Sequence, residues 1–205
     1  MQKINISLSD AVTALAITSD VRYLLSGSAD KSLKVFDLVE KRLLFSFDNL
    51  HEEAILTIAV TPDSRFIITG SQDTNMKIID LEARNVTHCF EGAHKGKRVF
   101  LISLFTFTGA IYSCLVTPDG QYLISASEDR SIKMYDFETK TLVHNFLRAH
   151  TDAILAIAVT PNSKYLLSAS ADKNIKIFDL NSRKHSHTLE GAHEGIDFSC
   201  ERILI

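Results

Sequence analysis

Two copies of one pattern decide the fold, HEEAILTIAVTPDSRFIITGSQDTNMKIID (51–80) and HTDAILAIAVTPNSKYLLSASADKNIKIFD (150–179). Extended to His94 and His193, the two stretches are identical at 23 of 44 positions. An aromatic or aliphatic residue followed by Asp closes each copy and recurs at the equivalent place in four units. Its Asp residues, at spacings of 43, 56 and 43, are Asp37, Asp80, Asp136 and Asp179. Repetition at such a period indicates an array of supersecondary units.

Each unit has the sequence pattern of four short strands. In the second unit, residues 54–60 are apolar at nearly every position and precede a Thr-Pro-Asp turn, which predicts a strand buried on both faces. Further strands are expected at 65–69, 76–81 and 86–90, with a tight turn at 70–75. The last strand alternates apolar and polar residues, as at a solvent-exposed edge. Such a meander buries its faces only by stacking on its neighbours.

The composition favours a protein that is cytoplasmic or lies in another intracellular compartment. Charge is nearly balanced, with 22 Lys and Arg against 25 Asp and Glu, so neither nucleic acid nor an anionic membrane is an expected partner. Three cysteines at unrelated spacings fit a reducing compartment. The first residues lack a signal peptide pattern, which predicts that the protein is not secreted. The longest apolar stretch, 99–107, is too short to span a bilayer.

In these markers the chain resembles the WD-repeat β-propeller family, over roughly residues 8–193. The resemblance implies a structural hydrogen-bond network of His, Ser or Thr, Asp and Trp in each blade. The positions carried over are His51, Thr69 and Asp73; His94, Ser125 and Asp129; and His150, Ser168 and Asp172. The first unit has Ser26 and Asp30, but Leu8 replaces the His. Trp is absent, and its positions hold Phe36, Ile79, Tyr135 and Phe178, so each network is expected to lose one hydrogen bond.

The expected fold is therefore all-β, with four WD-type blades of four antiparallel strands in an open or partial propeller. The propeller is placed at 1–193 and a degenerate tail at 194–205. The expected blades are about 9–50, 51–93, 94–149 with an insertion at 96–108, and 150–192. Residues 3–8 align with the outer strand of a further blade, and a fifth unit begins after His193. Because open edges pair, we expect self-association or completion by another chain.

The 56-residue interval results from 13 additional residues, 96–108, with the sequence GKRVFLISLFTFT. Three interpretations remain open for this apolar segment. It is an interaction loop that presents Phe105 and its apolar neighbours, or an extra strand that pairs with an open sheet edge. Alternatively it is a retained intron, because its ends are compatible with splice-site codons and it keeps the reading frame.

The expected function is a non-catalytic scaffold or adaptor for other proteins, with no cofactor and no metal. Ser125, His94 and Asp129 have the residue types of a hydrolase triad. The same trio recurs in three units, however, whereas catalysis needs one site, and histidines spread around a ring cannot converge on one ion. A third alternative is a non-functional fragment from a truncated gene model.

Partner-binding residues are expected on the loops that enter each blade and on the turns between second and third strands, as the resemblance implies. Tyr112 is the strongest candidate, because aromatic residues are enriched at interface hot spots and the matching positions hold Thr or Leu. The full set of candidates is Gln72, Lys95, Phe105, Tyr112, Glu128 and Asp152.

Overall fold

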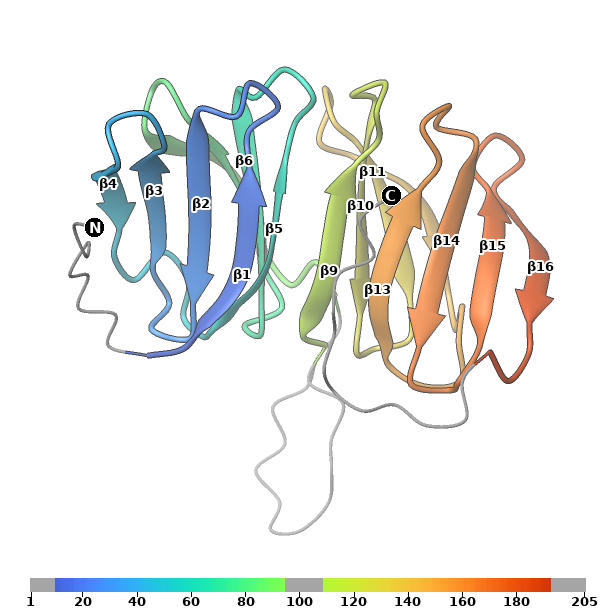
Figure 1. Cartoon of the computed structure of the whole chain (residues 1–205). Helices are drawn as coiled ribbons and strands as arrows, with labels where there is room; N and C mark the ends of the chain where they lie inside the picture. The colour runs from blue at the N-terminus through green and yellow to red at the C-terminus, as the bar shows by residue number, and fades with distance from the viewer. Residues whose placement is uncertain (1–9, 95–108, 193–205) are drawn as a thin grey trace, which may run out of the picture.

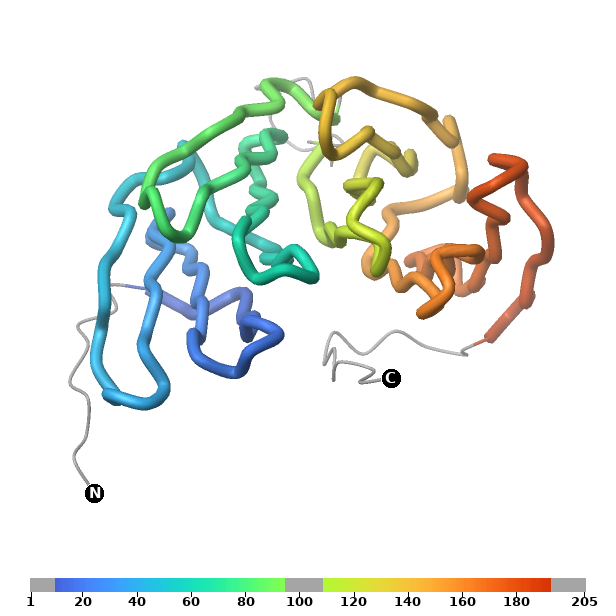
Figure 2. Tube along the Cα trace, turned by 90° about the horizontal axis from the view of Figure 1, so that it is seen from above, coloured from blue at the N-terminus to red at the C-terminus, as the bar shows by residue number. Residues whose placement is uncertain are grey.

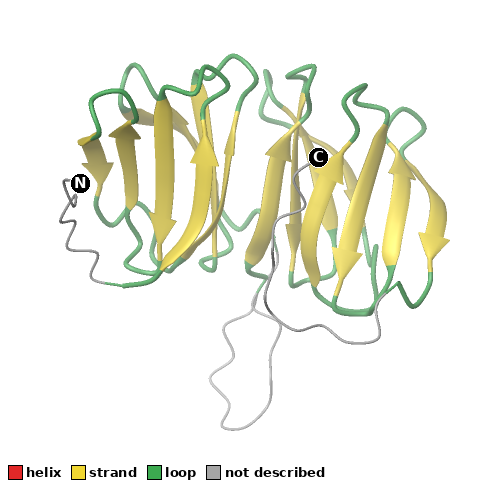
Figure 3. Ribbon diagram, in the orientation of Figure 1, coloured by secondary structure: helices red, strands yellow, loops and turns green. Residues whose placement is uncertain are grey.

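The computed structural model describes residues 10–94 and 109–192, which form four separate four-stranded antiparallel sheets (Figures 1 and 3). No helix occurs among these residues. The prediction of an all-β fold with four blades is thus confirmed.

Each blade is a meander whose strands pair in sequence order. Blade 1 contains β1 (Val12–Ile17), β2 (Tyr23–Ser28), β3 (Leu33–Asp37) and β4 (Arg42–Phe47). Blade 2 contains β5 (Ile55–Val60), β6 (Phe66–Ser71), β7 (Met76–Asp80) and β8 (Asn85–Phe90). Blade 3 contains β9 (Ile111–Val116), β10 (Tyr122–Ser127), β11 (Ile132–Asp136) and β12 (Leu142–Phe146). Blade 4 contains β13 (Ile154–Val159), β14 (Tyr165–Ser170), β15 (Ile175–Asp179) and β16 (Lys184–Leu189).

The blades follow one another along an open arc (Figure 2). The first strands lie on the inside of the arc, where β5 contacts both β1 and β9, and β9 also contacts β13. Blades 1 and 4 form the two ends of the arc and do not close it. The expectation of an open propeller is therefore confirmed.

The repeated turns are built by the residues that mark the repeat. In blade 2 the Thr61 hydroxyl donates to Asp63 at 2.5 Å and accepts from the Phe66 N–H at 2.9 Å, which closes the turn between β5 and β6. Asp80, from the repeated aromatic or aliphatic pair, accepts the N–H groups of Glu82 and Ala83 at 2.9 and 2.8 Å. This carboxylate therefore shapes the turn that leads into the outer strand.

The apolar core lies between blades. One cluster joins blades 1 and 2, a second joins blades 2 and 3, and a third joins blades 3 and 4. The expectation that the first strand of each blade is buried on both faces is wrong in part. In β13 only Ile154 is buried, whereas five of six residues of β6 and of β10 are buried. The first strands line the inside of the arc, so the second strands, covered by sheet neighbours and adjacent blades, carry more of the core.

Strand β6 is longer than the pattern predicted. The expected turn at 70–75 begins with Gly70, but the strand continues through Gly70 and Ser71. A Cβ on Gly70 would lie 2.7 Å from the Thr57 Cγ2 atom and 2.8 Å from the Ile111 Cγ2 atom. The glycine therefore permits close approach of blade 3 rather than reversal of the chain.

Blades 2 and 3 pack together across the longer interval. Ile68, Ile78 and Phe90 of blade 2 belong to one cluster with Ile111 and Leu123 of blade 3. The joint is therefore built by described residues on both sides. The additional segment 96–108, with its three interpretations, lies outside the described residues.

Candidate functional site

One face of the arc, formed by one set of strand ends, carries three copies of a buried histidine with its partners, and we call it the histidine face. It comprises the described residues of the loops that precede β5, β9 and β13, together with the turns between the second and third strands, at the lower end of the blades in Figure 1. In blade 2 the His51 Nδ1 atom lies 3.0 Å from Asp73, and Nε2 lies 2.8 Å from the Thr69 hydroxyl. In blade 4 His150 makes the corresponding bonds to Asp172 and Ser168, at 2.9 and 2.7 Å.

Blade 3 repeats this geometry. The His94 Nδ1 atom lies 3.0 Å from Asp129, and Nε2 lies 2.8 Å from the Ser125 hydroxyl. A carboxylate only accepts, so Nδ1 carries the hydrogen and Nε2 of the neutral ring accepts from the serine. Ser131 adds a hydroxyl 2.6 Å from Asp129. Each histidine thus ties the chain entering a blade to the turn between its second and third strands.

Burial controls the charge of these groups. Desolvation lowers the pKa of His94 below its usual value, although the Asp129 carboxylate acts in the opposite direction. For Asp129, burial by itself raises the pKa, but hydrogen bonding to His94, the charge of His94 when protonated, and bonds from Ser131 lower it to about 2. The pKa of Asp73 is lowered to about 2 in the same way, by His51 and backbone N–H groups. Near neutral pH, His94 is therefore neutral and both carboxyl groups are ionised.

A lysine on each third strand stabilises the same loops and was missed by the sequence analysis. Lys77 donates to the Leu50 carbonyl at 2.6 Å, and Lys176 donates to the Ala149 carbonyl at 2.7 Å. Lys133 donates to the Ala93 carbonyl. Each of these carbonyls precedes the blade's histidine. The signal was present, because a lysine recurs three residues before each repeated Asp, at Lys34, Lys77, Lys133 and Lys176.

Of the four residues at the positions where the WD-repeat family has Trp, only Tyr135 has a polar group in its side chain. Its hydroxyl donates to the Ala93 carbonyl at 3.3 Å. It is directed to the same acceptor as Lys133, and burial raises its pKa to about 12. Phe36, Ile79 and Phe178 have no side-chain donor. Ile79 and Phe178 instead pack between blades, in the joint of blades 1 and 2 and in that of blades 3 and 4.

The Ser125, His94 and Asp129 geometry matches that of a hydrolase triad, but the nucleophile is inaccessible. The exposed fraction is 0% for Ser125 and 1% for His94. The two equivalent hydroxyl residues, Thr69 and Ser168, are equally enclosed. The hydroxyl group therefore has no room for a substrate carbonyl beside it. In the described residues no group of three or more His, Cys, Asp or Glu side chains could hold a metal ion.

The candidate partner-binding residues lie on the histidine face where the structure describes them. Gln72 and Asp152 are exposed, and Glu128 is half-buried. The half-buried Tyr112 lies on β9 at a β-bulge, where two residues of β9 oppose one of β10. Burial raises the Tyr112 pKa, and the charge of Glu128 contributes to the rise. Lys95 and Phe105 lie outside the described residues.

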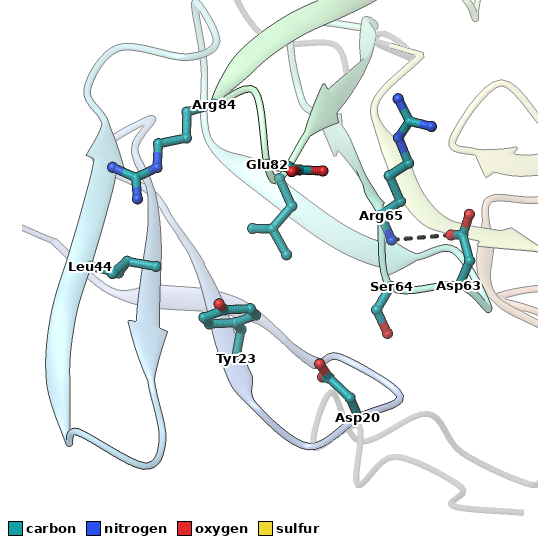
Figure 4. Close-up of a pocket in the computed structure, with 9 residues that line it drawn as sticks. Asp20, Tyr23, Leu44, Asp63, Ser64, Arg65, Glu82 and Arg84 are labelled. Carbon is teal, nitrogen blue, oxygen red and sulfur yellow. Dashed lines mark hydrogen bonds between the residues drawn. The ribbon is translucent and has the colours of Figure 1, made fainter.

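A pocket of about 420 Å³ opens on the face of the arc opposite the histidine face, between blades 1 and 2 (Figure 4). Tyr23 lies on one side, and Arg65 and Arg84 line the other. Both guanidinium groups have partners, because Arg65 bonds to Asp80 at 3.2 Å and Arg84 lies 4.9 Å from the Phe45 ring centre. In the joint of blades 2 and 3, Phe137 packs against Phe66 instead. Leu81, which lines the pocket, occupies the position of Phe137 in its blade.

The fold and the histidine network, present in three of the four blades, define a repeat protein of the β-propeller class. The family model of the WD domain, G-beta repeat, matches residues 3–37, 42–80, 101–136 and 140–179, more than half of the chain. The chain therefore belongs to the WD40 family, whose domains mediate protein interactions. No curated protein matches the chain. Within the described ranges, no helix is long and apolar enough to cross a membrane.

Proposed function

We propose that this protein is a non-catalytic adaptor that binds other proteins through its histidine face, inside the cell. The partner contacts we assign are Gln72, Tyr112, Glu128 and Asp152. Lys95 and Phe105 complete the set proposed from the sequence. Nucleic acid, membranes and cofactors have no part in this function.

The observation that carries the proposal is the combination of rigid loops and a redirected aromatic side chain. The His51 and His150 networks hold the loops and turns of the histidine face in place, so a partner that docks there orders few groups. A β-bulge turns a side chain out of the regular strand alternation, and Tyr112 occupies such a position. Beside it, Glu128 supplies a charge at the rim. An aromatic anchor with a polar rim is the usual anatomy of a binding hot spot.

Affinity capture with quantitative mass spectrometry tests the proposal. The full chain and its variants are used as bait in an extract of the cells that produce the protein. Tyr112→Ala and Asp152→Arg are each expected to reduce the same set of captured proteins at least tenfold. Glu138→Arg is the matched control, because Glu138 is an exposed acid in the turn between β11 and β12, on the opposite face. Equal loss from the control variant, or unchanged capture by both test variants, would refute the assignment.

A further inference from the structure

Among residues 10–94 and 109–192, each of the two end blades carries exposed apolar side chains on a side that no neighbouring blade covers. We call the side of a blade that faces the preceding blade its leading side, and the other its trailing side. On the leading side of blade 1, Val12 is 42% exposed, Leu15 42% and Ile17 54%. Their equivalents in blade 2 are covered, because Ile55 is 0% exposed, Ile58 8%, and Val60 packs in the joint with blade 1. Exposed apolar surface of this extent indicates an interaction site.

The trailing side of blade 4 also carries apolar side chains that are exposed. Leu167, Ile175 and Ile177 are partly exposed. Their equivalents in blades 1, 2 and 3 are all 0% exposed, namely Leu25, Ile68 and Ile124; Leu33, Met76 and Ile132; and Val35, Ile78 and Met134. Leu189 on the outer strand is 45% exposed. Blade 4 therefore has the apolar trailing surface of the other blades without a following blade among the described residues.

The two uncovered sides are the two halves of one repeated interface. In the joint of blades 1 and 2, a Cβ on Gly27 would lie 2.7 Å from the Ile55 Cγ2 atom. In the next joint, the corresponding pair is Gly70 and Ile111, at 2.8 Å. A small residue on each trailing side thus receives a β-branched residue from the next leading side. At the ends of the arc, Ala169 is the equivalent small residue on the trailing side of blade 4, and Val12 is the equivalent β-branched residue on the leading side of blade 1.

We propose that two copies of this chain close into one eight-bladed ring. The leading side of blade 1 in each copy packs on the trailing side of blade 4 in the other, so that Val12 contacts the partner's Ala169. The two joints formed in this way continue the three joints already present within each chain. Eight blades lie within the usual range of propellers, and a ring leaves no unpaired side.

Disulfide trapping tests the contact directly. The Cβ positions of the equivalent pairs within the chain are 3.2 and 3.3 Å apart, close to the spacing that a disulfide spans. The double variant Val12→Cys, Ala169→Cys is expected to form a covalent dimer under mild oxidation, which reduction reverses. Either single variant, and the wild type with its own three cysteines, should remain uncrosslinked. A dimer from Val12→Cys alone would mean that like sides pair, and no dimer from the double variant would overturn the proposal.

Light scattering with size exclusion gives an independent measurement on the full chain. The wild type should have a mass of about 46 kDa at micromolar concentration, twice the 22.9 kDa of one chain. Leu15→Glu and Leu167→Glu should each reduce it to the monomer mass. The control Leu147→Glu, at a 75% exposed leucine in the turn after β12, should leave it unchanged. A wild-type monomer, or growth into larger open assemblies, would refute the ring.

Mixing the two disruptive variants distinguishes this arrangement from others. Leu15→Glu retains an intact trailing side, and Leu167→Glu retains an intact leading side. A mixture should therefore recover a dimer held by one unaltered joint, although neither variant dimerises alone. Circular dichroism of each variant confirms that it is folded. Failure of two folded variants to associate would contradict head-to-tail pairing.

Discussion

The histidine networks should stabilise the blades, and Thr69→Val tests this without changing the shape of the core. Thr69 is 0% exposed, and its hydroxyl lies 2.8 Å from the His51 Nε2 atom. Valine has the same shape, so the substitution leaves Nε2 without its donor in a place that water does not reach. A buried polar group that loses its partner costs about 1–3 kcal/mol. We therefore expect the free energy of unfolding to fall by about that amount.

Urea unfolding followed by far-UV circular dichroism measures this change, because the chain has no Trp for fluorescence. For a chain of this size, the expected fall corresponds to a decrease in Tm of about 2–12 °C at fixed protein concentration. Thr141→Val is the matched control. Thr141 is exposed and its hydroxyl bonds to another exposed hydroxyl, so its change should stay within about 0.5 kcal/mol. An equally small change for Thr69→Val would show that the bond does not stabilise the fold.

Three further predictions concern acid, packing and thiol chemistry. The free energy of unfolding should fall as the pH drops below 6.5, because the folded-state pKa of His94 is lowered, and again below about 3.8, because the pKa of the Asp129 carboxyl group is about 2. A pH series of urea titrations measures this, and stability that rises in either range would contradict it. Gly70→Ala should lower the free energy of unfolding by about 1–3 kcal/mol, since its Cβ would collide with blade 3, and a loss below about 0.5 kcal/mol in the same titration would show that the joint can widen. Burial raises the Cys114 pKa to about 12, so at pH 8 a thiol reagent should label the half-buried Cys89 and leave Cys114 unlabelled until urea unfolds the protein. Peptide mass spectrometry measures both, and labelling of Cys114 as fast as Cys89 in the folded protein would contradict this.

The sequence predicted the number, order and pairing of the strands because the markers that recur are the residues that build the turns. Asp80 and its equivalents shape the turn before the outer strand. Thr61 and Asp63 close the turn before the second strand. Local hydrogen bonds of this kind need only neighbouring residues, so a period in sequence translates directly into a period in structure.

Burial within a blade could not be predicted in the same way. An apolar strand such as 54–60 has the same pattern whether it is covered on both faces or lines the inside of an arc. The sequence predicted a turn at Gly70, and only the position of Ile111 in the folded chain shows that the glycine permits close approach of blade 3. The lysine bonds escaped detection for another reason. Lys77 and Leu50 are 27 residues apart, and only the folded sheet brings them together.

The offset between repeat and blade explains why the ends of the arc carry apolar sides. The matched repeats 42–80 and 140–179 each begin with the outer strand of one blade and end with the third strand of the next, so these repeats link neighbouring blades. The apolar clusters lie between blades, and four blades in a row make only three of them. In such an array stability comes from the contacts between neighbours, and closure of the ring by a second copy would add a joint at each end of the arc. Two chains that close on each other each gain one joint without any change to a blade.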